Sequence, residues 1–555
     1  MKKNILLKSI LCGIAMIGLS ACSDFFEPDN NAMLKGDDYI KEASEMYAGF
    51  LGVMTKVQAI GDKAIYLTDS RAEIMIPTDR DVDMYALSNY ESDLTGNKYA
   101  DPAKYYDLII SCNDYLQKIY EFKQKHLYSI DMEHYKGLVA STIRVKTWTY
   151  FTMAKIYNEV VWFDDPMYKM KDYAQYPKLN LDQTIDKCVQ YLATGFDGVD
   201  GNHTMSWTEW IASDTSLSAG DYTFWDMMAP EYFVLAAELA LWQGRWQDVV
   251  DLILPKMNEA FASASTYTKW MCQANYANGY GNRIFISENP NGQAAVSVIT
   301  YNYQKDQTNN TKQNLYSAPI LRPSELGLAR FSSKSFNPNA FVTEDYTQSS
   351  TRDKRFSAHF DQDSYGKWRM YKWRRSTDNY IYIYRNVELY LMLIEAFNHI
   401  PERAEERYVL MNEGVSNYFP DGGVTYPGFT NDWTRVGGAV THAYADTGMR
   451  GTHGASSDTN RKGLLCRNMK KELNNERHND LEVLKEYCLE FPCEGKTLPV
   501  MIRMAKRYND PTIISDLVCS KYSEENAAIA AKVRAKIESG DYFVHWDIDS
   551  TSSTH

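Results

Sequence analysis

The sequence lacks the features that mark several large classes of protein. Beyond residue 19 it contains no apolar run of about 18 residues, the length that a membrane-spanning helix needs. It contains no HExxH or GxSxG motif, no CxxC pair and no two histidines four residues apart. These absences exclude a polytopic membrane protein and leave no sequence signal for a zinc site, a metalloprotease or a serine hydrolase.

Positive charge is also scarce. The chain has 59 Lys and Arg against 72 Asp and Glu, so its formal net charge is −13. Such an acidic chain argues against a nucleic-acid partner, because phosphate backbones are bound mainly by Lys and Arg. We attribute the charge to solubility. Hydrophobic residues make up 44% of the chain, which is close to the globular norm and excludes a wholly disordered protein.

The N-terminus has the pattern of a secretory signal that ends at a lipidation site. Lys2 and Lys3 precede an apolar run over residues 5–19, which ends in Leu19-Ser20-Ala21-Cys22. This ending resembles the bacterial lipobox, so we expect residues 1–21 to be removed and Cys22 to carry acyl chains such as palmitate. Residues 22–36 would form an acidic tether. Its start resembles the export tag of Bacteroidetes surface lipoproteins, with an ordinary polar tether as the alternative.

The remaining cysteines do not form a recognisable framework. Nine are present, and seven remain after Cys12 leaves with the signal and Cys22 is acylated. Their spacing suggests neither a dense disulfide scaffold nor a metal site, so buried free thiols are expected. The seven are Cys112, Cys188, Cys272, Cys466, Cys488, Cys493 and Cys519.

Helical periodicity dominates the rest of the chain. Apolar residues recur at steps of three and four in many segments, as on one face of an amphipathic helix. Helices are predicted over residues 40–54, 108–122, 132–157, 230–243, 246–257, 382–397, 402–411, 470–487, 496–508, 511–522 and 525–539. The pairs resemble tetratricopeptide units without a clean repeat register. Long polar, aromatic-rich segments at 62–104, 198–228, 262–380 and 414–468 are predicted to be loops with short strands on this scaffold.

Two partial motifs carry no chemistry. Asp79, Asp81 and Asp83 alternate like the start of an EF-hand loop, but the required Gly and Glu are missing, so a surface Asp cluster is predicted. Gly495-Lys496-Thr497 resembles the end of a phosphate-binding loop, but Glu490 stands where its first Gly should be. We therefore predict no metal and no cofactor.

Seven segments in order carry a resemblance to a known family. The segments are Leu67–Glu73, Tyr106–Asn113, Ile143–Phe151 with Asp165-Pro166, Gly244–Val249, Asp353–Phe356, Tyr384–Ala396, and Glu490–Lys496 followed by Ile502–Arg507. Together with the lipobox they resemble the SusD/RagB family of nutrient-binding outer-membrane lipoproteins of Bacteroidetes. The motifs are mostly structural: Arg385, Glu388 and Glu395 are interpreted as a polar helix face or a buried network.

The resemblance implies the fold, the cellular location and the binding partner of the protein. It implies a mostly α fold, with tetratricopeptide-like helix pairs forming a scaffold with long irregular loops and a few short strands. A single domain over 37–555 would comprise a helical part (37–260), a loop-rich insertion (261–380) and a second helical part (381–555). The lipid-anchored protein would lie in the cell outer membrane, facing the exterior. There it would cap a TonB-dependent transporter of the SusC type as a lid, binding nutrient oligomers without cleaving them.

The ligand is predicted to be an oligosaccharide or polysaccharide. The chain has 41 Tyr, about twice its 21 Phe, and Tyr combines a flat apolar ring with a hydroxyl, which suits binding faces as well as cores. Sugar rings stack on such faces while amides and Arg pair with their hydroxyls. The candidates are Arg71, Tyr85, Asn89, Tyr90, Trp270, Tyr276, Asn278, Tyr280, Tyr301, Tyr303 and Tyr316.

Two alternatives to this ligand remain. One is a peptide-binding lid of the RagB type. The other is a surface hydrolase, because catalytic carboxylates pair in space and leave no sequence signal. Trp148, Trp242 and Trp246 lie on predicted helices and are expected in the core.

Overall fold

The chain folds into antiparallel helix pairs joined by short two-stranded sheets. The computed structural model describes residues 40–166, 176–205, 225–262, 285, 295–301, 307–331, 355–375, 380–412 and 475–546. The described part is mostly helical, as the periodicity of the sequence predicts. Among these residues, no helix is both long enough and apolar enough to cross a bilayer.

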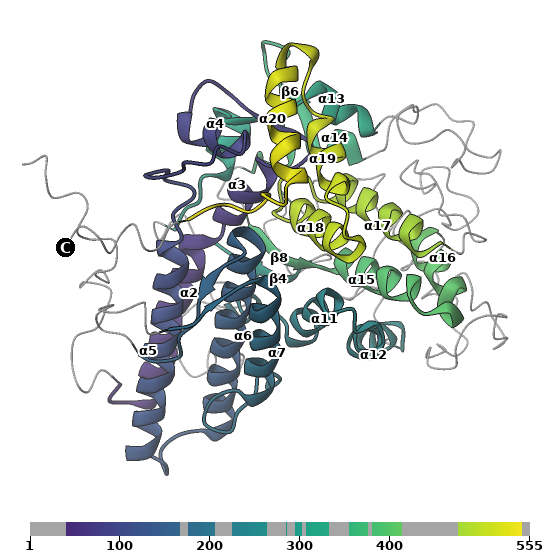
Figure 1. Cartoon of the computed structure of the whole chain (residues 1–555). Helices are drawn as coiled ribbons and strands as arrows, with labels where there is room; N and C mark the ends of the chain where they lie inside the picture. The colour runs from purple at the N-terminus through teal and green to yellow at the C-terminus, as the bar shows by residue number, and fades with distance from the viewer. Residues whose placement is uncertain are drawn as a thin grey trace, which may run out of the picture.

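The N-terminal half supplies long helices that lie side by side in the lower part of Figure 1. Its helices are α2 (Ala43–Ile60), α3 (Lys63–Asp69), α4 (Val82–Ser88), α5 (Ala103–Lys125), α6 (Met132–Tyr157), α7 (Leu181–Thr194), α10 (Trp225–Met228), α11 (Tyr232–Trp242) and α12 (Trp246–Ala262). Helix α5 packs between α2 and α6, α7 packs on α6, and α11 pairs with α12. Sequential helices therefore pair as they do in tetratricopeptide-like units.

The C-terminal half repeats this arrangement on the other side. Its longer helices are α15 (Asn386–Asn398), α16 (Ala404–Asn412), α17 (Glu476–Glu490), α18 (Thr497–Tyr508), α19 (Thr512–Cys519) and α20 (Ala527–Glu538). Consecutive members pair as α15 with α16, α17 with α18, and α19 with α20. Helix α15 also packs on α11 and α12, which joins the two halves. One continuous hydrophobic cluster contains residues from Ile40 to Val544.

Between the helices lie four antiparallel two-stranded sheets. They pair β1 (Met75–Pro77) with β5 (Leu321–Pro323), β2 (Val160–Val161) with β3 (Lys178–Leu179), β4 (Ala295–Ile299) with β8 (Ile381–Arg385), and β6 (Phe360–Gln362) with β7 (Trp368–Met370). Short helical turns accompany them: η6 (Gln313–Ser317), α13 (Glu325–Leu328), η7 (Ala329–Phe331), α14 (Arg355–His359), η10 (Tyr371–Trp373), η11 (Pro401–Arg403) and η15 (Glu524–Asn526).

Some predicted boundaries are wrong. Residues 382–385 were expected to begin a helix but form strand β8, because this Ile-Tyr-Ile-Tyr run of aromatic and β-branched residues pairs with β4 and is buried on both faces. The segment 62–104 was expected to be a loop, but it contains α3 and α4 as well as β1. Helix α7 was not predicted at all, although the capping box at Asn180 marks its start.

Two groups of core predictions can be compared with the structure. Trp148, Trp242 and Trp246 pack against the core but are only partly buried. Five of the seven predicted thiols lie in the described part of the chain, and all five are free. Four of them are buried and one is half-buried, in the order Cys112, Cys188, Cys488, Cys493 and Cys519. Cys272 and Cys466 lie outside the described residues.

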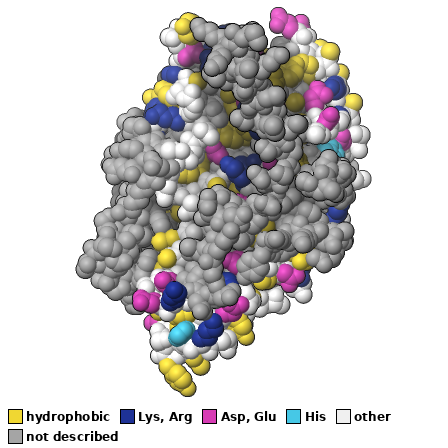
Figure 2. Space-filling model, turned by 90° about the vertical axis from the view of Figure 1, so that its left-hand side faces the viewer, with side chains coloured by type: hydrophobic (Ala, Val, Ile, Leu, Met, Phe, Trp, Pro, Cys, Tyr) yellow, Lys and Arg dark blue, Asp and Glu magenta, His cyan; other side chains and the backbone are white. Residues whose placement is uncertain are grey.

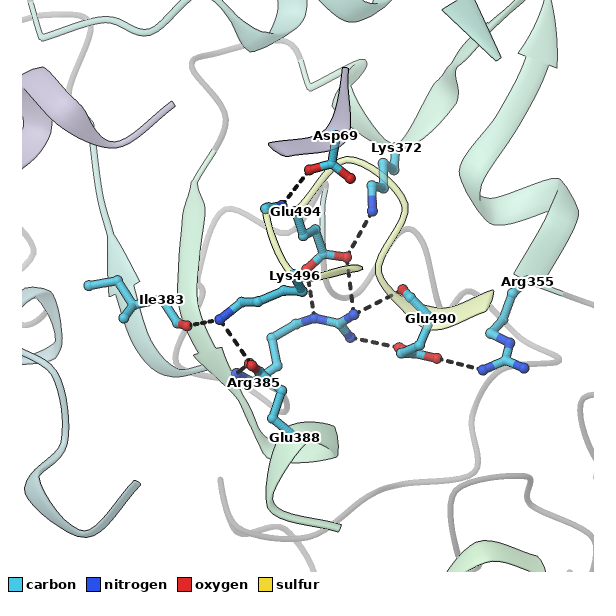
Figure 3. Close-up of polar contacts among 10 residues, drawn as sticks. Asp69, Arg355, Lys372, Ile383, Arg385, Glu388, Glu490, Glu494 and Lys496 are labelled. Atoms are coloured by element: carbon cyan, nitrogen blue, oxygen red, sulfur yellow. Dashed lines mark hydrogen bonds and ion pairs between the residues drawn. The ribbon is translucent and has the colours of Figure 1, made fainter. Parts of the chain in front are cut away.

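A buried ionic network ties strand β8, Arg355 and Lys372 to the end of α17 and the loop that follows it (Figure 3). Arg385, at the end of β8, donates hydrogen bonds of 2.8 to 3.1 Å to the carboxylates of Glu490 and Glu494. Lys372 donates to Glu494 at 2.8 Å, and Arg355 donates to Glu490 at 3.0 Å. The motif around Glu490 is thus structural, and Arg385 belongs to a buried network, as one of its two interpretations predicts.

Candidate ligand-binding face

Strand pairing brings residues 62–78 beside residues 310–323. Met75 of β1 lies opposite Pro323 of β5, and the N–H of Thr78 donates to the carbonyl of Ile320 at 2.9 Å. The carboxylate of Asp62 accepts a hydrogen bond from the N–H of Asn310 at 3.0 Å. The segment 307–323 therefore runs along α3 and β1, although more than 200 residues separate them in sequence.

Two tyrosines and two arginines form an interleaved stack beside this pairing. The guanidinium of Arg369 lies 3.9 Å from the ring centroid of Tyr316, and the guanidinium of Arg374 lies 3.3 Å from that of Tyr371. The two tyrosine rings are tilted, with centroids 6.4 Å apart. All four side chains are half-buried. Together with Asp361 these residues are called the Tyr316 face below.

The β6–β7 hairpin fixes the arginine of this face. Asp361 lies directly opposite Arg369 in the antiparallel pair and accepts two hydrogen bonds from it, at 2.9 and 3.0 Å. These hydrogen bonds raise the pKa of Arg369 above its usual value. A two-pronged pair of this kind holds a guanidinium in one plane. The Tyr316 ring therefore lies against a rigid, charge-compensated partner.

A second arginine anchors the hairpin to β5. Arg322 donates to the Trp368 carbonyl at 3.0 Å and to the Asp363 carboxylate at 2.9 Å. Burial alone would raise the pKa of Asp363. Hydrogen bonds from the backbone N–H groups of Lys367 and Tyr365, together with Arg322, outweigh this and lower it. Arg322 thus holds the β6–β7 hairpin against β5, which itself pairs with β1.

The Tyr316 face combines two aromatic rings with two guanidinium groups, and each guanidinium lies over the face of one ring. Aromatic faces bind flat apolar surfaces, and guanidinium N–H groups pair with hydroxyl, carbonyl or carboxylate oxygens. Asp361 offsets the charge of Arg369, and Arg374 donates a hydrogen bond to the carbonyl of Tyr371 at 2.9 Å. Burial lowers the pKa of Arg374.

Only some of the predicted ligand residues lie at such a surface. Tyr316 belongs to the Tyr316 face, and Tyr85 on α4 is 47% exposed. Both stay candidates. Five others, and the lipidation site, lie outside the described residues: Trp270, Tyr276, Asn278, Tyr280, Tyr303 and Cys22.

Four predicted ligand residues are corrected, because they are buried. Arg71 donates to the Phe543 carbonyl at 3.1 Å, and its guanidinium lies 3.9 Å from the ring centroid of Tyr90. The Tyr90 hydroxyl donates to the Arg71 carbonyl at 2.8 Å, and burial raises the pKa of Tyr90 to about 12. Side chains enclosed in this way offer no surface to a ligand.

The other two corrected residues are enclosed by different elements. Asn89 accepts a hydrogen bond from the hydroxyl of Tyr522, which follows α19. Tyr301 is 8% exposed, and its hydroxyl donates to the Gln58 carbonyl of α2 at 2.9 Å. Each aromatic or amide side chain thus fills space between its loop and a helical segment.

Sequence interpretation missed Arg369, Tyr371 and Arg374. A signal was present, because residues 368–375 read Trp-Arg-Met-Tyr-Lys-Trp-Arg-Arg and alternate aromatic with basic side chains. The Asp cluster was predicted to lie at the surface, but Asp81 is half-buried and structural: it caps α4 by accepting from the N–H of Met84 and pairs with Lys98 at 2.7 Å.

Charges of both signs occur on the described part of the one face that Figure 2 shows. On the face shown in Figure 2, basic and acidic side chains lie interspersed toward both ends of the molecule. Such a surface creates no strong field of one sign. Recognition by the described residues would therefore depend on local contacts.

Comparison with known proteins identifies the fold. No family model and no curated protein matches the sequence. Solved structures do match, among them a SusD superfamily protein from Bacteroides thetaiotaomicron (14% identity, 89% of this chain and 97% of that chain, TM-score 0.54). Another from Bacteroides vulgatus has 10% identity, covers 90% and 93% of the two chains, and has a TM-score of 0.55.

A third match is a SusD-like carbohydrate-binding protein from Bacteroides fragilis. It has 11% identity, covers 84% of this chain and 87% of that chain, and has a TM-score of 0.55. At these identities the likeness establishes the fold. The chain therefore has a SusD-like fold, as the seven sequence segments predict.

Proposed function

We propose, from the SusD-like fold, that this protein binds nutrient oligosaccharides at the bacterial surface and passes them to a transporter. The observation that carries the proposal is the fold match over most of the chain, which includes a structure described as carbohydrate-binding. The Tyr316 face supports the proposal, since two rings, each with a guanidinium over one face, offer apolar surface and N–H donors to the apolar faces and hydroxyls of sugars.

The proposed location follows from the N-terminus. Cys22 would be acylated after removal of residues 1–21, and the acyl chains would hold the protein on the outer leaflet of the outer membrane. The acidic segment after Cys22 supports export to the cell exterior. In this position the protein would act as the lid of a TonB-dependent transporter of the SusC type.

The proposed protein is a binder without catalysis, metal or cofactor. The alternative ligand is a peptide, as the resemblance to the RagB type implies. A surface hydrolase is the weaker alternative. Binding to a neutral glycan should hardly depend on salt, because such a ligand releases no counterions, whereas peptide carboxylates would be screened.

Calorimetric titration of the full mature chain against a panel of neutral oligosaccharides tests the proposal. Tyr316→Ala and Tyr371→Ala should each weaken binding by roughly ten- to a hundredfold, as the loss of one stacking ring does on other aromatic platforms. Tyr128→Ala is the matched control, because this tyrosine is fully exposed beyond the end of α5.

Three results would count against the proposal. If Tyr316→Ala, Tyr371→Ala and Tyr128→Ala bind the oligosaccharide with equal affinity, the Tyr316 face takes no part in binding. Steep weakening in 0.5 M salt, where screening extends only about 4 Å, would favour a charged ligand such as a peptide. Release of new reducing ends during incubation would indicate a hydrolase.

A further inference from the structure

The turn between α5 and α6 presents two apolar side chains to solvent. The Tyr128 side chain is fully exposed, and Leu127 is 51% exposed. Among the large hydrophobic residues that are exposed in the described part of the chain, these two are the only pair adjacent in sequence. Single apolar residues on a surface are ordinary, but a pair at one tip calls for an explanation.

The backbone fixes the outward direction of this pair. The N–H of Ser129 donates to the carbonyl of His126 at 3.0 Å, which closes a four-residue turn. Leu127 and Tyr128 occupy the two central positions of this turn. Ile130, which follows it, is buried in the core. The turn is therefore held from within, and its two central side chains are left uncovered.

The turn forms one end of the molecule. It is the lowest point of the described chain in Figure 1, and hydrophobic side chains stand at the lower tip in Figure 2. A projecting tip offers no concave site for a small molecule. Two side chains are also far too few for a stable protein interface, which buries about 1,200–2,000 Å². A fluid lipid surface, in contrast, can cover a projecting apolar tip.

Helix α2 brings the N-terminal part of the chain to the same end. The Tyr115 hydroxyl of α5 donates to the carbonyl of Met46 at 2.7 Å. Further along α2, Lys56 pairs with Asp107 of α5 at 2.8 Å. The two helices are therefore antiparallel, and the first residues of α2 point toward the α5–α6 turn.

The proposed lipid anchor would lie on this side. The Tyr47 ring of α2 contacts the His134 ring in the first turn of α6, with centroids 5.8 Å apart. Ile40 is the first described residue, and 17 residues separate it from Cys22. Even fully extended, a segment of that length spans no more than about 65 Å. An acylated Cys22 would therefore hold this end of the molecule near the bilayer.

Charges near the tip are mixed. Lys123 pairs with Asp197, and Lys136 pairs with Glu133 at 2.7 Å. Lys125 is exposed at the end of α5. Because carboxylates offset much of the positive charge, apolar insertion would contribute more than attraction to anionic headgroups. Contact with a zwitterionic bilayer should then depend little on salt.

We propose that the α5–α6 turn inserts Leu127 and Tyr128 into the surface of the membrane that carries the lipid anchor. Leucine would enter the acyl-chain boundary, and the tyrosine ring would lie at headgroup level with its hydroxyl hydrated. The proposal rests on the anchor proposed above for Cys22. Two side chains alone would not hold the protein there, but the anchor keeps them at high effective concentration beside the bilayer. This second contact would fix the orientation of the anchored protein.

Fluorescence of the full acylated chain in phosphatidylcholine vesicles tests this proposal. The fluorescent amino acid dansylalanine replaces Tyr128 in one variant and Tyr365 in the control. Tyr365 is 87% exposed between β6 and β7, at the opposite end of the molecule (Figure 1). We expect brominated phosphatidylcholine to quench the label at position 128 severalfold more than the label at position 365.

A second pair of variants tests the leucine. Leu127→Ser should leave the melting temperature unchanged, because the side chain is half exposed, while lowering the quenching at position 128 severalfold. Leu326→Ser is the matched control, because this leucine of α13 is 49% exposed, and it should change neither quantity.

Three outcomes would overturn the proposal. An unquenched label at position 128 on vesicles that carry the protein would overturn it and leave the anchor intact. Failure of the acylated chain to attach to vesicles would overturn both. Shielding of the label from aqueous iodide without quenching by the brominated lipid would mean that protein, and not lipid, covers the turn.

Discussion

The guanidinium of Arg385 is enclosed by carboxylates from a helix and a loop that lie more than 100 residues away in sequence (Figure 3). Desolvation of such charges is costly, and only complete pairing offsets the cost. The same geometry at the surface would contribute little, because water screens exposed ions. Burial therefore decides what an ion pair contributes in this protein.

Replacing Arg385 with Met should destabilise the fold strongly. The carboxylates of Glu490 and Glu494 would keep Arg355 and Lys372 but lose their shared partner, so unfolding free energy should fall by about 3–5 kcal/mol. Arg534→Met is the control, because the Arg534 side chain is 40% exposed and pairs with Asp516, and it should cost less than about 1 kcal/mol. Similar losses for both variants in chemical denaturation would contradict the assigned role of the network.

Asp69 should make stability depend on pH. Burial raises the pKa of its carboxyl to about 8, although the N–H groups of Cys493 and Gly495 donate to it. Its unfolded pKa is about 3.9. The folded state thus binds more protons between these values, and stability should decrease as pH rises from about 4 to 8, by at most about 1.4 kcal/mol per pH unit.

Denaturation curves measured across this pH range for the wild type and Asp69→Asn check the sign. The Asn variant cannot ionise, so the stability of the wild type relative to it should fall with rising pH. A constant difference between the two proteins would show that Asp69 does not titrate in this range.

At the scale of elements, the partly buried Trp246 joins three helical segments. The Trp246 ring of α12 stacks on the His399 ring that follows α15, with centroids 4.0 Å apart, and the guanidinium of Arg507 from α18 lies 4.6 Å from its centroid. One residue therefore touches three helical segments. Its solvent exposure limits how much this contact stabilises the fold.

Trp246→Ala should cost about 2 kcal/mol, less than the roughly 3–5 kcal/mol expected for a fully buried aromatic residue. Trp246→Phe should cost less, because a ring can still stack on His399. Thermal melting of both variants measures the difference. Unchanged melting with lost ligand binding would contradict a structural role for this tryptophan.

At the scale of the whole molecule, the proposed lipid anchor should make membrane attachment independent of folding. Cys22→Ala should leave the fold intact but release the protein from outer membranes, because the lipid chains alone would hold it there. Fractionation after a carbonate wash measures the release. Retention of the variant in the membrane fraction would require another attachment.

Local chemistry explains why most of the helical scaffold could be predicted. Apolar steps of three and four residues specify a helix face without reference to the rest of the chain, and α5, α6, α18 and α20 lie close to their predicted positions. Strand β8 was mistaken for helix, since only its pairing with β4 reveals its type. The division of the chain into three parts stays a prediction.

The amino-acid sequence by itself determined most of the helices, and it predicts the signal and the lipobox, because each depends on residues close together in the chain. Only the tertiary structure decided which aromatic residues are available to a ligand. Tyr90 and Tyr316 both lie in polar, aromatic-rich segments, yet the C-terminal segments enclose Tyr90 while the β6–β7 hairpin leaves Tyr316 at the surface. Burial depends on contacts between residues hundreds of positions apart, and no local pattern encodes it.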